Sequence, residues 1–390
     1  MPTRGGWLLG LWSVAAGVSG RLLGLRELYL VAAGSGALLA GALAYVRSRP
    51  IALGTTRDLD PARVTAGGAC RVDLTLTNHG RRRAPPLDVD DATGGRFRLA
   101  GLSPAETARA TYRFGPTGRG LVAVGPLRVG LHDPFGLAIS ETTVLDPSTL
   151  IVHPRVDPIT LPAERRGSPA ASGARSAVPP RRGDDFHSLR PYEEGDDLRL
   201  VHWPTSARLD ALVVRQDEAP LVRRTVLALD LRHAVHDAVT LERAVSAAAG
   251  VAAAACDGEG LLRLVTTAGA DSGSAGGPGH LTSVLDLLAT VQSHEGGGAG
   301  PLTSALAGDE GATAVLVTTR SVPPGDLEAL ARLGPHCALL VAVLVDRWSG
   351  GGRAPQPSVP AAFDLVVAVA GEVPFGVAWE RAVSRSGAPA

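Results

Sequence analysis

Two apolar segments near the N-terminal end of the chain constrain its fold most strongly. Gly5–Gly20 and Leu28–Val46 contain no charged residue. A helix needs about 20 apolar residues to cross the roughly 30 Å hydrocarbon core of a bilayer, and Leu28–Val46 meets that length. Gly5–Gly20 is shorter, but the long side chain of Arg21 can extend it to the interface. The sequence therefore predicts a transmembrane helical hairpin over residues 1–50.

The flanking charges predict how this hairpin is oriented. More basic residues lie outside the two spans than between them: Arg4, Arg47, Arg49 and Arg57 lie outside, and Arg21 and Arg26 lie between. Cytoplasmic flanks carry the excess of basic residues in membrane proteins. We therefore expect a multi-pass protein of the cell membrane with the bulk of the chain in the cytoplasm.

Two other interpretations of the N-terminal segments stay open. Arg4, the apolar run after it and the small residues at 18–20 also fit a cleaved signal peptide. Leu28–Val46 would then still stop transfer and leave the residues after 47 inside. Two buried core helices are a third interpretation, which the lack of a polar face on either segment disfavours.

The composition of the chain excludes several classes of function. Lys+Arg and Asp+Glu are equal at 38 each, and aromatic residues make up 4%, which disfavours nucleic-acid binding. Cys70, Cys256 and Cys337 are odd in number and far apart. They predict buried free thiols in a reducing compartment rather than disulfides or a zinc site. No cofactor is expected.

After the hairpin, residues 51–154 predict a small all-β sandwich-like domain. Short runs with period-two alternation are separated by turn residues; they are Arg71–Asn78, Ala110–Phe114, Leu127–Gly130 and Thr149–His153. No catalytic cluster is visible in this region. The Pro/Ser/Arg/Ala-rich stretch 155–182 that follows is typical of a linker.

Residues 223–390 alternate between apolar strands and helices, which predicts a doubly wound α/β domain. The expected strands are 225–230, 261–267, 312–318, 337–345 and 363–369, and the expected helices are 239–256, 281–291, 324–333 and 377–384. Two glycine-rich insertions, 268–280 and 294–301, are expected to be flexible loops. Neither insertion has the residues of a phosphate-binding loop.

The segment 183–222 is rich in charged, histidine and aromatic residues, and these form a motif that resembles that of a known family. The chain here resembles the bacterial family called domain of unknown function 58, whose core motif is Arg-x-Tyr-x-x-Gly-Asp-Asp/Glu-x-Arg-x-Ile-x-Trp followed by Ser/Thr-Ala-Arg. The matching residues are Arg190, Tyr192, Gly195, Asp196, Asp197, Arg199, Trp203, Ser206, Ala207 and Arg208. The hairpin, the β-rich part with Asp133–Gly136 at its end, and the α/β part also fit this family.

The resemblance carries expectations about fold and partners. It implies a von Willebrand factor A-like α/β domain after the motif and an association with MoxR-type AAA+ ATPases. Similar proteins look like membrane-tethered partners in the assembly or maturation of envelope or metal-dependent complexes. We therefore expect a non-enzymatic adaptor rather than an enzyme.

The residues at the expected metal site depart from the von Willebrand A pattern. That pattern is Asp-x-Ser-x-Ser after the first strand, which supplies hard oxygen ligands for Mg²⁺. This chain has Asp230-Leu-Arg232-His-Ala234. A guanidinium at position 232 would repel a cation and can itself pair with Asp230, and no Asp follows the strand 312–318. We expect a degenerate site without bound metal.

The signature residues allow three interpretations. Their arginines and carboxylates can form an ion-pair network that fixes a loop, with Trp203 as its apolar anchor. They can instead form a partner-docking surface, since Arg, Tyr and Trp are frequent binding hot spots. The alternative function is a divalent-metal-dependent ligand binder or hydrolase, whose cluster would be Glu193, Asp196, Asp197 and His202.

Overall fold

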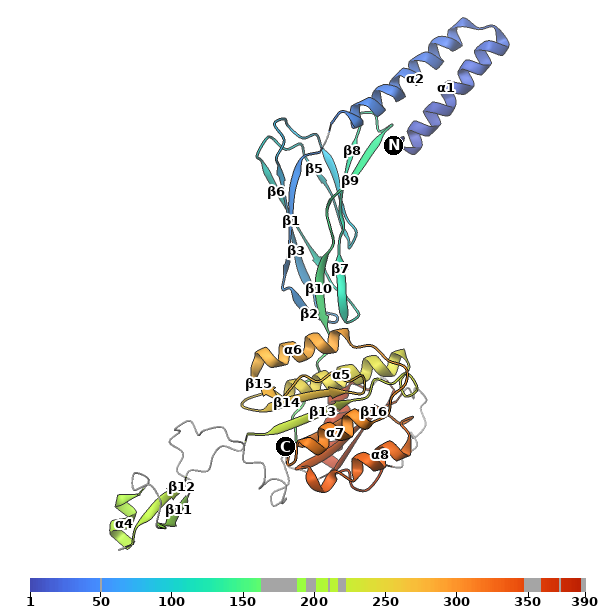
Figure 1. Cartoon of the computed structure of the whole chain (residues 1–390). Helices are drawn as coiled ribbons and strands as arrows, with labels where there is room; N and C mark the ends of the chain where they lie inside the picture. Colours follow the sequence, from blue (N-terminus) through green and yellow to red (C-terminus); the bar gives the residue numbers. More distant parts are fainter. Residues whose placement is uncertain are drawn as a thin grey trace. The chain divides into compact units, whose positions relative to one another are not determined.

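A computed structural model describes the chain in two compact units, Met1–Arg155 and Val156–Ala390 (Figure 1). The residues described are 1–49, 51–162, 188–193, 201–209, 211–216, 222–346, 359–371 and 373–386.

The first unit begins with a pair of apolar helices, α1 (Arg4–Leu23) and α2 (Arg26–Arg47), which lie side by side (Figure 1). Gly24 joins them in the left-handed conformation, at φ 70°. Small residues let the helices approach: a Cβ at Gly17 would lie 3.7 Å from that of Ala32. The Ser13 hydroxyl donates to the Ala32 carbonyl at 2.7 Å. The predicted N-terminal helical pair is confirmed.

The two helices differ in how well they suit a bilayer. By length and composition α2 can cross a membrane, and only 11% of its most apolar 18-residue stretch is buried within the protein. Helix α5 (Ala238–Ala255) passes the same test, but 61% of it is buried, as in the core helix of a soluble domain. Helix α1 is slightly less apolar than this test of a membrane-spanning helix requires. Its outward face is nonetheless apolar and exposed, through Trp7, Leu8, Leu11, Trp12, Val14, Val18, Leu22 and Leu23.

The rest of the first unit is β-rich, with three sheets around one core. One sheet has the order β1 (Leu53–Asp60), β3 (Cys70–Asn78), β6 (Thr107–Phe114). The second is β5 (Gly95–Leu99), β4 (Leu87–Asp91), β8 (Leu127–His132), β9 (Ile139–Leu145). The third is β2 (Arg63–Thr65), β10 (Ser148–His153), β7 (Gly120–Val124).

Period-two alternation explains how this core forms. Along β3, Cys70, Val72, Leu74 and Leu76 are all buried, and the residues between them are more exposed. The strands expected from the alternating runs are present as β3, β6, β8 and β10. The predicted β-rich region is thus confirmed.

A buried ion pair ties the three sheets together. Arg57 on β1 donates to the Asp91 carboxylate at 2.9 Å, and both side chains are fully buried. The same guanidinium donates to the Val124 carbonyl at 2.8 Å and to the Ser148 hydroxyl at 3.3 Å. From the sequence, Arg57 is expected to be a flanking charge of the membrane span. In the fold Asp91 neutralises it, so it is unavailable to lipid headgroups.

The second unit is built on a six-stranded sheet with helices on both faces (Figure 1). Its strand order is β15 (Ala275–Gly276), β14 (Leu261–Thr266), β13 (Arg224–Leu229), β16 (Thr313–Thr319), β17 (Leu339–Val345), β18 (Leu365–Val369). All neighbours are parallel except β15, which is antiparallel to β14.

Alternate strand residues face two separate cores. Leu227 and Leu229 pack with α5, α6 (Gly277–Thr290) and α9 (Phe375–Ser386). Val226 and Ala228 pack with α7 (Gly300–Gly308) and α8 (Pro324–Ala331). The predicted alternation of strands and helices is therefore confirmed, with helices covering both faces of the sheet. The three cysteines are free and buried, as predicted.

Two sequence-based assignments differ from the structure. The glycine-rich insertions are not entirely loops, because β15 and the start of α6 lie within 268–280 and α7 begins within 294–301. A proline in the first turn starts each of these helices despite the glycines around it. Residues 156–162, assigned to the linker, pack on the second unit: Leu161 is buried in its core, and Trp379 Nε1 donates to the Thr160 carbonyl at 2.8 Å.

Candidate functional site

Polar side chains gather where the parallel strands of the second unit end. Asp230 directly follows β13, Thr267 follows β14, and Thr318 is the penultimate residue of β16. Because these strands are neighbours and parallel, their carboxyl ends meet at one edge of the sheet, where α/β proteins commonly bind ligands. Asp230 and Arg232, which were singled out from the sequence, lie at this edge.

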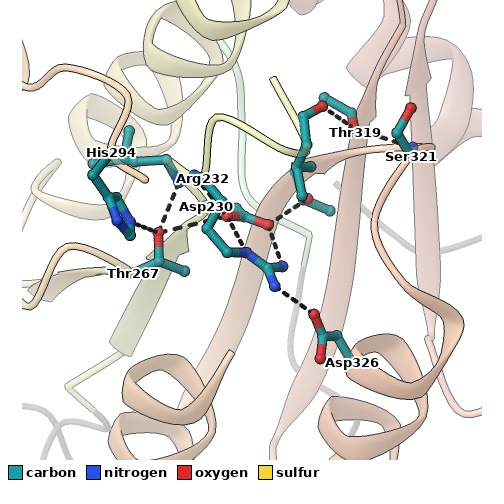
Figure 2. A network of polar contacts seen from close by, with 10 residues as sticks. Asp230, Arg232, Thr267, His294, Thr319, Ser321 and Asp326 are labelled. Carbon is teal, nitrogen blue, oxygen red and sulfur yellow. Dashed lines mark hydrogen bonds and ion pairs between the residues drawn. The ribbon is translucent and has the colours of Figure 1, made fainter. Parts of the chain in front are cut away.

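The guanidinium of Arg232 fills that site (Figure 2). Its Nε donates to Asp230 Oδ1 at 2.9 Å, and its Nη2 donates to Oδ2 at 2.7 Å. Its Nη1 donates to Asp326 on α8 at 2.7 Å. Asp230 is 1% exposed and Arg232 6%. The predicted pairing of Arg232 with Asp230 is confirmed, and its bidentate geometry is the strongest form of such a pair.

Further donors surround the Asp230 carboxylate. The Thr318 hydroxyl donates to Oδ2 at 3.0 Å, and the Arg232 backbone N–H donates to Oδ1 at 3.1 Å. The Thr267 hydroxyl lies 3.5 Å from Oδ1, and His294 Nε2 lies 3.0 Å from that hydroxyl (Figure 2). Burial raises the pKa of Asp230, but the hydrogen bonds and charge of Arg232, with Thr318, outweigh it and hold the pKa below its usual value.

A buried histidine lies close behind this network. His236 is 2% exposed, and neither ring nitrogen has a hydrogen-bond partner of good geometry. Burial lowers the pKa of His236, against the opposing charge of Asp230. The imidazole is therefore neutral at physiological pH and contributes no cationic partner to Asp230.

The donors around Asp230 disfavour a bound cation. Both oxygens of Asp230 accept hydrogen bonds from Arg232, so a cation would have to displace a bidentate guanidinium. Across the described ranges, no group of three His, Cys, Asp or Glu side chains is placed to hold a metal ion. We call this arrangement the strand-end cluster, and its residues are Asp230, Arg232, Thr267, His294, Thr318 and Asp326.

The sequence pointed to only part of this cluster. Asp230 and Arg232 were identified, whereas Asp326, Thr267, Thr318 and His294 were not. Thr267 and Thr318 could have been predicted from the sequence, because each lies at the end of an apolar strand. Asp326 carried none, because it reaches Arg232 from the first turn of a helix 94 residues away.

The signature segment has its own small structure. Strands β11 (Ser188–Pro191) and β12 (Val213–Gln216) pair antiparallel, and α4 (Trp203–Leu209) lies between them in sequence. Arg190 is in register with Val214. The Tyr192 N–H donates to the Leu212 carbonyl at 2.9 Å. Gly195, Asp196, Asp197 and Arg199 lie outside the described residues, as does most of the acidic cluster proposed for a hydrolase.

Ser206 has a structural role in this segment. It is 7% exposed, and its Oγ accepts the Val213 N–H at 2.9 Å, which joins α4 to β12. The His202 N–H donates to the Val213 carbonyl at 2.8 Å, and His202 Nδ1 lies 2.8 Å from the Thr205 hydroxyl. These contacts fix the short helix α4 against β12.

Trp203 does not act as the buried anchor of the ion-pair interpretation. It is 62% exposed, and Leu209 and Leu212 beside it are 63% and 41% exposed. Arg208 is exposed on the same short helix. The small sheet instead buries Val201, Val213 and Val214. The segment therefore combines a fixed backbone with exposed apolar and basic side chains, which we call the α4 surface (Trp203, Arg208, Leu209, Leu212).

Comparisons with solved structures give weak resemblances. The CARDB domain of the PF1109 protein from Pyrococcus furiosus is 16% identical, with a TM-score of 0.19; the match covers 26% of this chain and 91% of that domain. Red sea bream transglutaminase is 12% identical, covering 27% and 15%, with a TM-score of 0.17. A putative beta-galactosidase from Bacteroides fragilis is 11% identical, covering 81% and 41%, with a TM-score of 0.17. Likenesses this weak support no inference about fold or activity.

The family comparison is more informative. No curated protein matches the chain. Residues 188–306 match the profile of a family described as protein of unknown function DUF58. This stretch contains the α4 surface, Asp230 and Arg232, and it runs from the signature strands to α7. The match agrees with the motif found in the sequence, and over residues 188–306 it confirms the resemblance to the domain of unknown function 58 family.

Proposed function

We propose that this protein is a membrane-anchored, non-enzymatic adaptor that docks a MoxR-type AAA+ ATPase at the cytoplasmic face of the cell membrane. Its role would be in the assembly or maturation of envelope or metal-dependent complexes. The observation that carries the proposal is the α4 surface, where Trp203, Leu209 and Leu212 are exposed inside the family's signature.

The geometry of the α4 surface suits docking. Exposed Trp and Arg side chains are the types that contribute most to binding energy at protein interfaces. The Ser206–Val213 hydrogen bond and the β11–β12 pairing fix the backbone beneath them. A preorganised surface loses less conformational entropy when a partner binds. The apolar side chains that would be unfavourable in water would then be covered by the ATPase.

The strand-end cluster supports an adaptor rather than a metal-dependent role. The strand order, the antiparallel edge strand and the position of Asp230 favour a von Willebrand factor A-like domain. In such a domain, a guanidinium here would take the place of the divalent cation. Arg232 would keep the strand ends in one arrangement without metal-dependent switching.

The helical pair supports membrane attachment. Helix α2 is long and apolar enough to span a bilayer, and α1 exposes an apolar face beside it. Arg4, Arg47 and Arg49 are exposed at the open end of the pair. By the positive-inside rule this end, and the units that follow it, would lie in the cytoplasm, where an AAA+ ATPase is accessible.

Co-purification tests the partnership. The full chain and a MoxR-type ATPase from the same organism are expressed together, and the ATPase recovered with wild-type protein is compared with that recovered with Arg208→Glu and Arg199→Glu. We expect loss of recovery with both variants, since each places a negative charge in the signature. Arg96→Glu, which reverses an exposed arginine of the β-rich unit, is the control and should recover normally. Equal recovery from all four proteins would exclude the signature as the docking surface.

A further inference from the structure

A rigid turn in the β-rich unit presents an exposed phenylalanine. Asp133 is 4% exposed, and its carboxylate accepts the Phe135 N–H at 2.9 Å and the Ala138 N–H at 2.6 Å. The Gly136 N–H donates to the Asp133 carbonyl at 3.0 Å, and Gly136 adopts φ 70°. A buried carboxylate thus holds the turn, and Phe135 at its tip is 69% exposed.

This turn is joined to the start of α1. The Thr3 hydroxyl donates to the Gly136 carbonyl at 2.6 Å, and the Thr3 N–H donates to the Leu137 carbonyl at 2.9 Å. The Ile139 N–H donates to the Met1 carbonyl at 2.8 Å. A Cβ at Gly6 would overlap the Leu137 carbonyl oxygen, so the first turn of α1 lies directly against residues 136–139. Phe135 therefore has a fixed position beside the first turn of the helix.

The length of α1 places that position relative to a bilayer. Its 20 residues rise about 1.5 Å each, and the resulting length of about 30 Å equals the hydrocarbon thickness. If α1 spans the bilayer, its first residue must lie at the headgroup boundary, because the helix is no longer than the hydrocarbon core is thick. The Asp133–Gly136 turn, bonded to Thr3 just before the helix, comes to lie at the same boundary.

We propose that Phe135 inserts into the lipid interface beside α1, so that the β-rich unit contacts the membrane directly as well as through the hairpin. The proposal rests on the membrane anchoring proposed above. Exposed Arg4, Arg47 and Arg49 at the same end of the hairpin would meet lipid phosphates, and the aromatic ring would lie at the level preferred by interfacial side chains. The occupant of this surface is therefore the bilayer that already holds the hairpin.

The last turns of α2 support a fixed contact. Ala42 and Val46 are buried in the core of the β-rich unit, with Leu43 and Tyr45 packed against it. Both helices thus meet the unit at their open ends, α1 through Thr3 and Gly6 and α2 through Ala42 and Val46. Two attachments limit rotation of the β-rich unit about the hairpin. The aromatic tip then cannot turn away from the interface.

Spin labels on the full chain test this placement. The chain is reconstituted in vesicles of phosphatidylethanolamine and phosphatidylglycerol, with one label at Phe135→Cys, Leu121→Cys or Leu11→Cys. Burial raises the pKa of all three native thiols, that of Cys337 to about 11, so labelling is selective. Leu121 is a matched control, because it is 61% exposed in the same unit, on a strand drawn away from the helices (Figure 1).

Collisions with oxygen and with a water-soluble nickel chelate report the depth of each label. We expect the label at 11 to collide mainly with oxygen, the label at 135 to show higher oxygen and lower nickel collision than that at 121, and the label at 121 to behave as in water. If the label at position 11 lies deep in the bilayer but the label at 135 has the same collision rates as the label at 121, the Phe135 proposal is wrong and the membrane anchoring stands. If the label at position 11 also behaves as in water, both the Phe135 proposal and the membrane anchoring are wrong. A label at 135 shielded from both reagents would show that protein, such as a second copy, covers it, and would equally overturn the proposal.

Discussion

Replacing Arg232 by alanine should destabilise the α/β unit by about 3–5 kcal/mol, because it leaves the buried carboxylate of Asp230 without its counter-ion. Asp230 is 1% exposed, and its carboxylate accepts hydrogen bonds from both Nε and Nη2 of the Arg232 guanidinium. The remaining donors, Thr318 and the Arg232 backbone N–H, do not neutralise its charge. Hydrogen exchange of β13 and β16 amides in the full chain in detergent measures the stability of this unit specifically.

The same variant should change the response to pH. In the wild type the pKa of Asp230 is held below its ordinary value, so this carboxylate contributes stability above the unfolded pKa of about 3.9 and loses it as pH falls through the folded pKa. In Arg232→Ala, burial remains without the guanidinium, so the folded pKa of Asp230 should rise above the unfolded value. Protonation then relieves the buried charge, and the stability gap between variant and wild type should narrow as pH is lowered from 7 towards 5.

Two controls sharpen this prediction. Arg263→Ala removes an arginine that also bridges two carboxylates, Asp271 and Asp309, but in a more exposed setting, and it should have a smaller effect. The double variant Asp230→Asn with Arg232→Ala removes the charge itself and should recover part of the loss. A stability gap that stays constant between pH 7 and pH 5 would contradict the role assigned to Asp230.

Replacing Arg57 by alanine should destabilise the β-rich unit by a comparable amount, about 3–5 kcal/mol. The Arg57 and Asp91 side chains are fully buried, and the guanidinium connects β1 with the Val124 carbonyl and the Ser148 hydroxyl. Its loss would leave Asp91 buried and unpaired and would free acceptors on two other strands. Exchange of β1, β4 and β7 amides should accelerate, while β13 and β16 remain protected.

The surface pair Arg96–Asp90 is the matched control for Arg57. It has a similar N–O distance, 2.9 Å, but the Arg96 side chain is 80% exposed, so solvent screens the interaction. Arg96→Ala should leave the exchange pattern nearly unchanged. Joint replacement of the buried pair, Arg57→Met with Asp91→Leu, should restore much of the protection, since no charge is then left unpaired. Equal effects of Arg57→Ala and Arg96→Ala would contradict the account.

Much of the architecture could be predicted from the sequence because its strongest patterns are local. The charge-free run Leu28–Val46, the alternation along Cys70–Asn78 and the apolar strand before Asp230 each specify an element through neighbouring residues alone. The pairing of Arg232 with Asp230 was also accessible, because only one residue separates them. These local signals gave the helical pair, the β-rich region and the alternating strands and helices.

The contacts that connect distant segments were not accessible in this way. Nothing around Arg57 indicates that it pairs with Asp91 rather than facing lipid, since the pair depends on how three sheets meet. Asp326 reaches Arg232 only because α8 begins over the ends of the strands. One interpretation made Trp203 the apolar anchor of an ion-pair network, but its side chain is 62% exposed. The short segment around it offers too small a core to cover the ring.

Among the described residues, two polar sites are engaged in contacts within the fold. The strand-end cluster is neutralised by Arg232, and Ser206 is committed to holding α4. Outside the helical pair, the α4 surface and the Phe135 turn expose aromatic side chains, Trp203 at 62% and Phe135 at 69%. We propose that the α4 surface binds a partner ATPase and that the Phe135 turn contacts the membrane.

The affinity of the ATPase for the full chain in nanodiscs tests the central claim most directly. The purified MoxR-type ATPase is titrated against wild-type protein, Trp203→Ala and the control Leu121→Ala, which removes an equally exposed apolar side chain elsewhere. A hot-spot tryptophan contributes about 2 kcal/mol or more, so Trp203→Ala should bind roughly 30-fold more weakly while Leu121→Ala binds as the wild type does. Wild-type affinity in Trp203→Ala, or no binding by the wild type, would contradict the account.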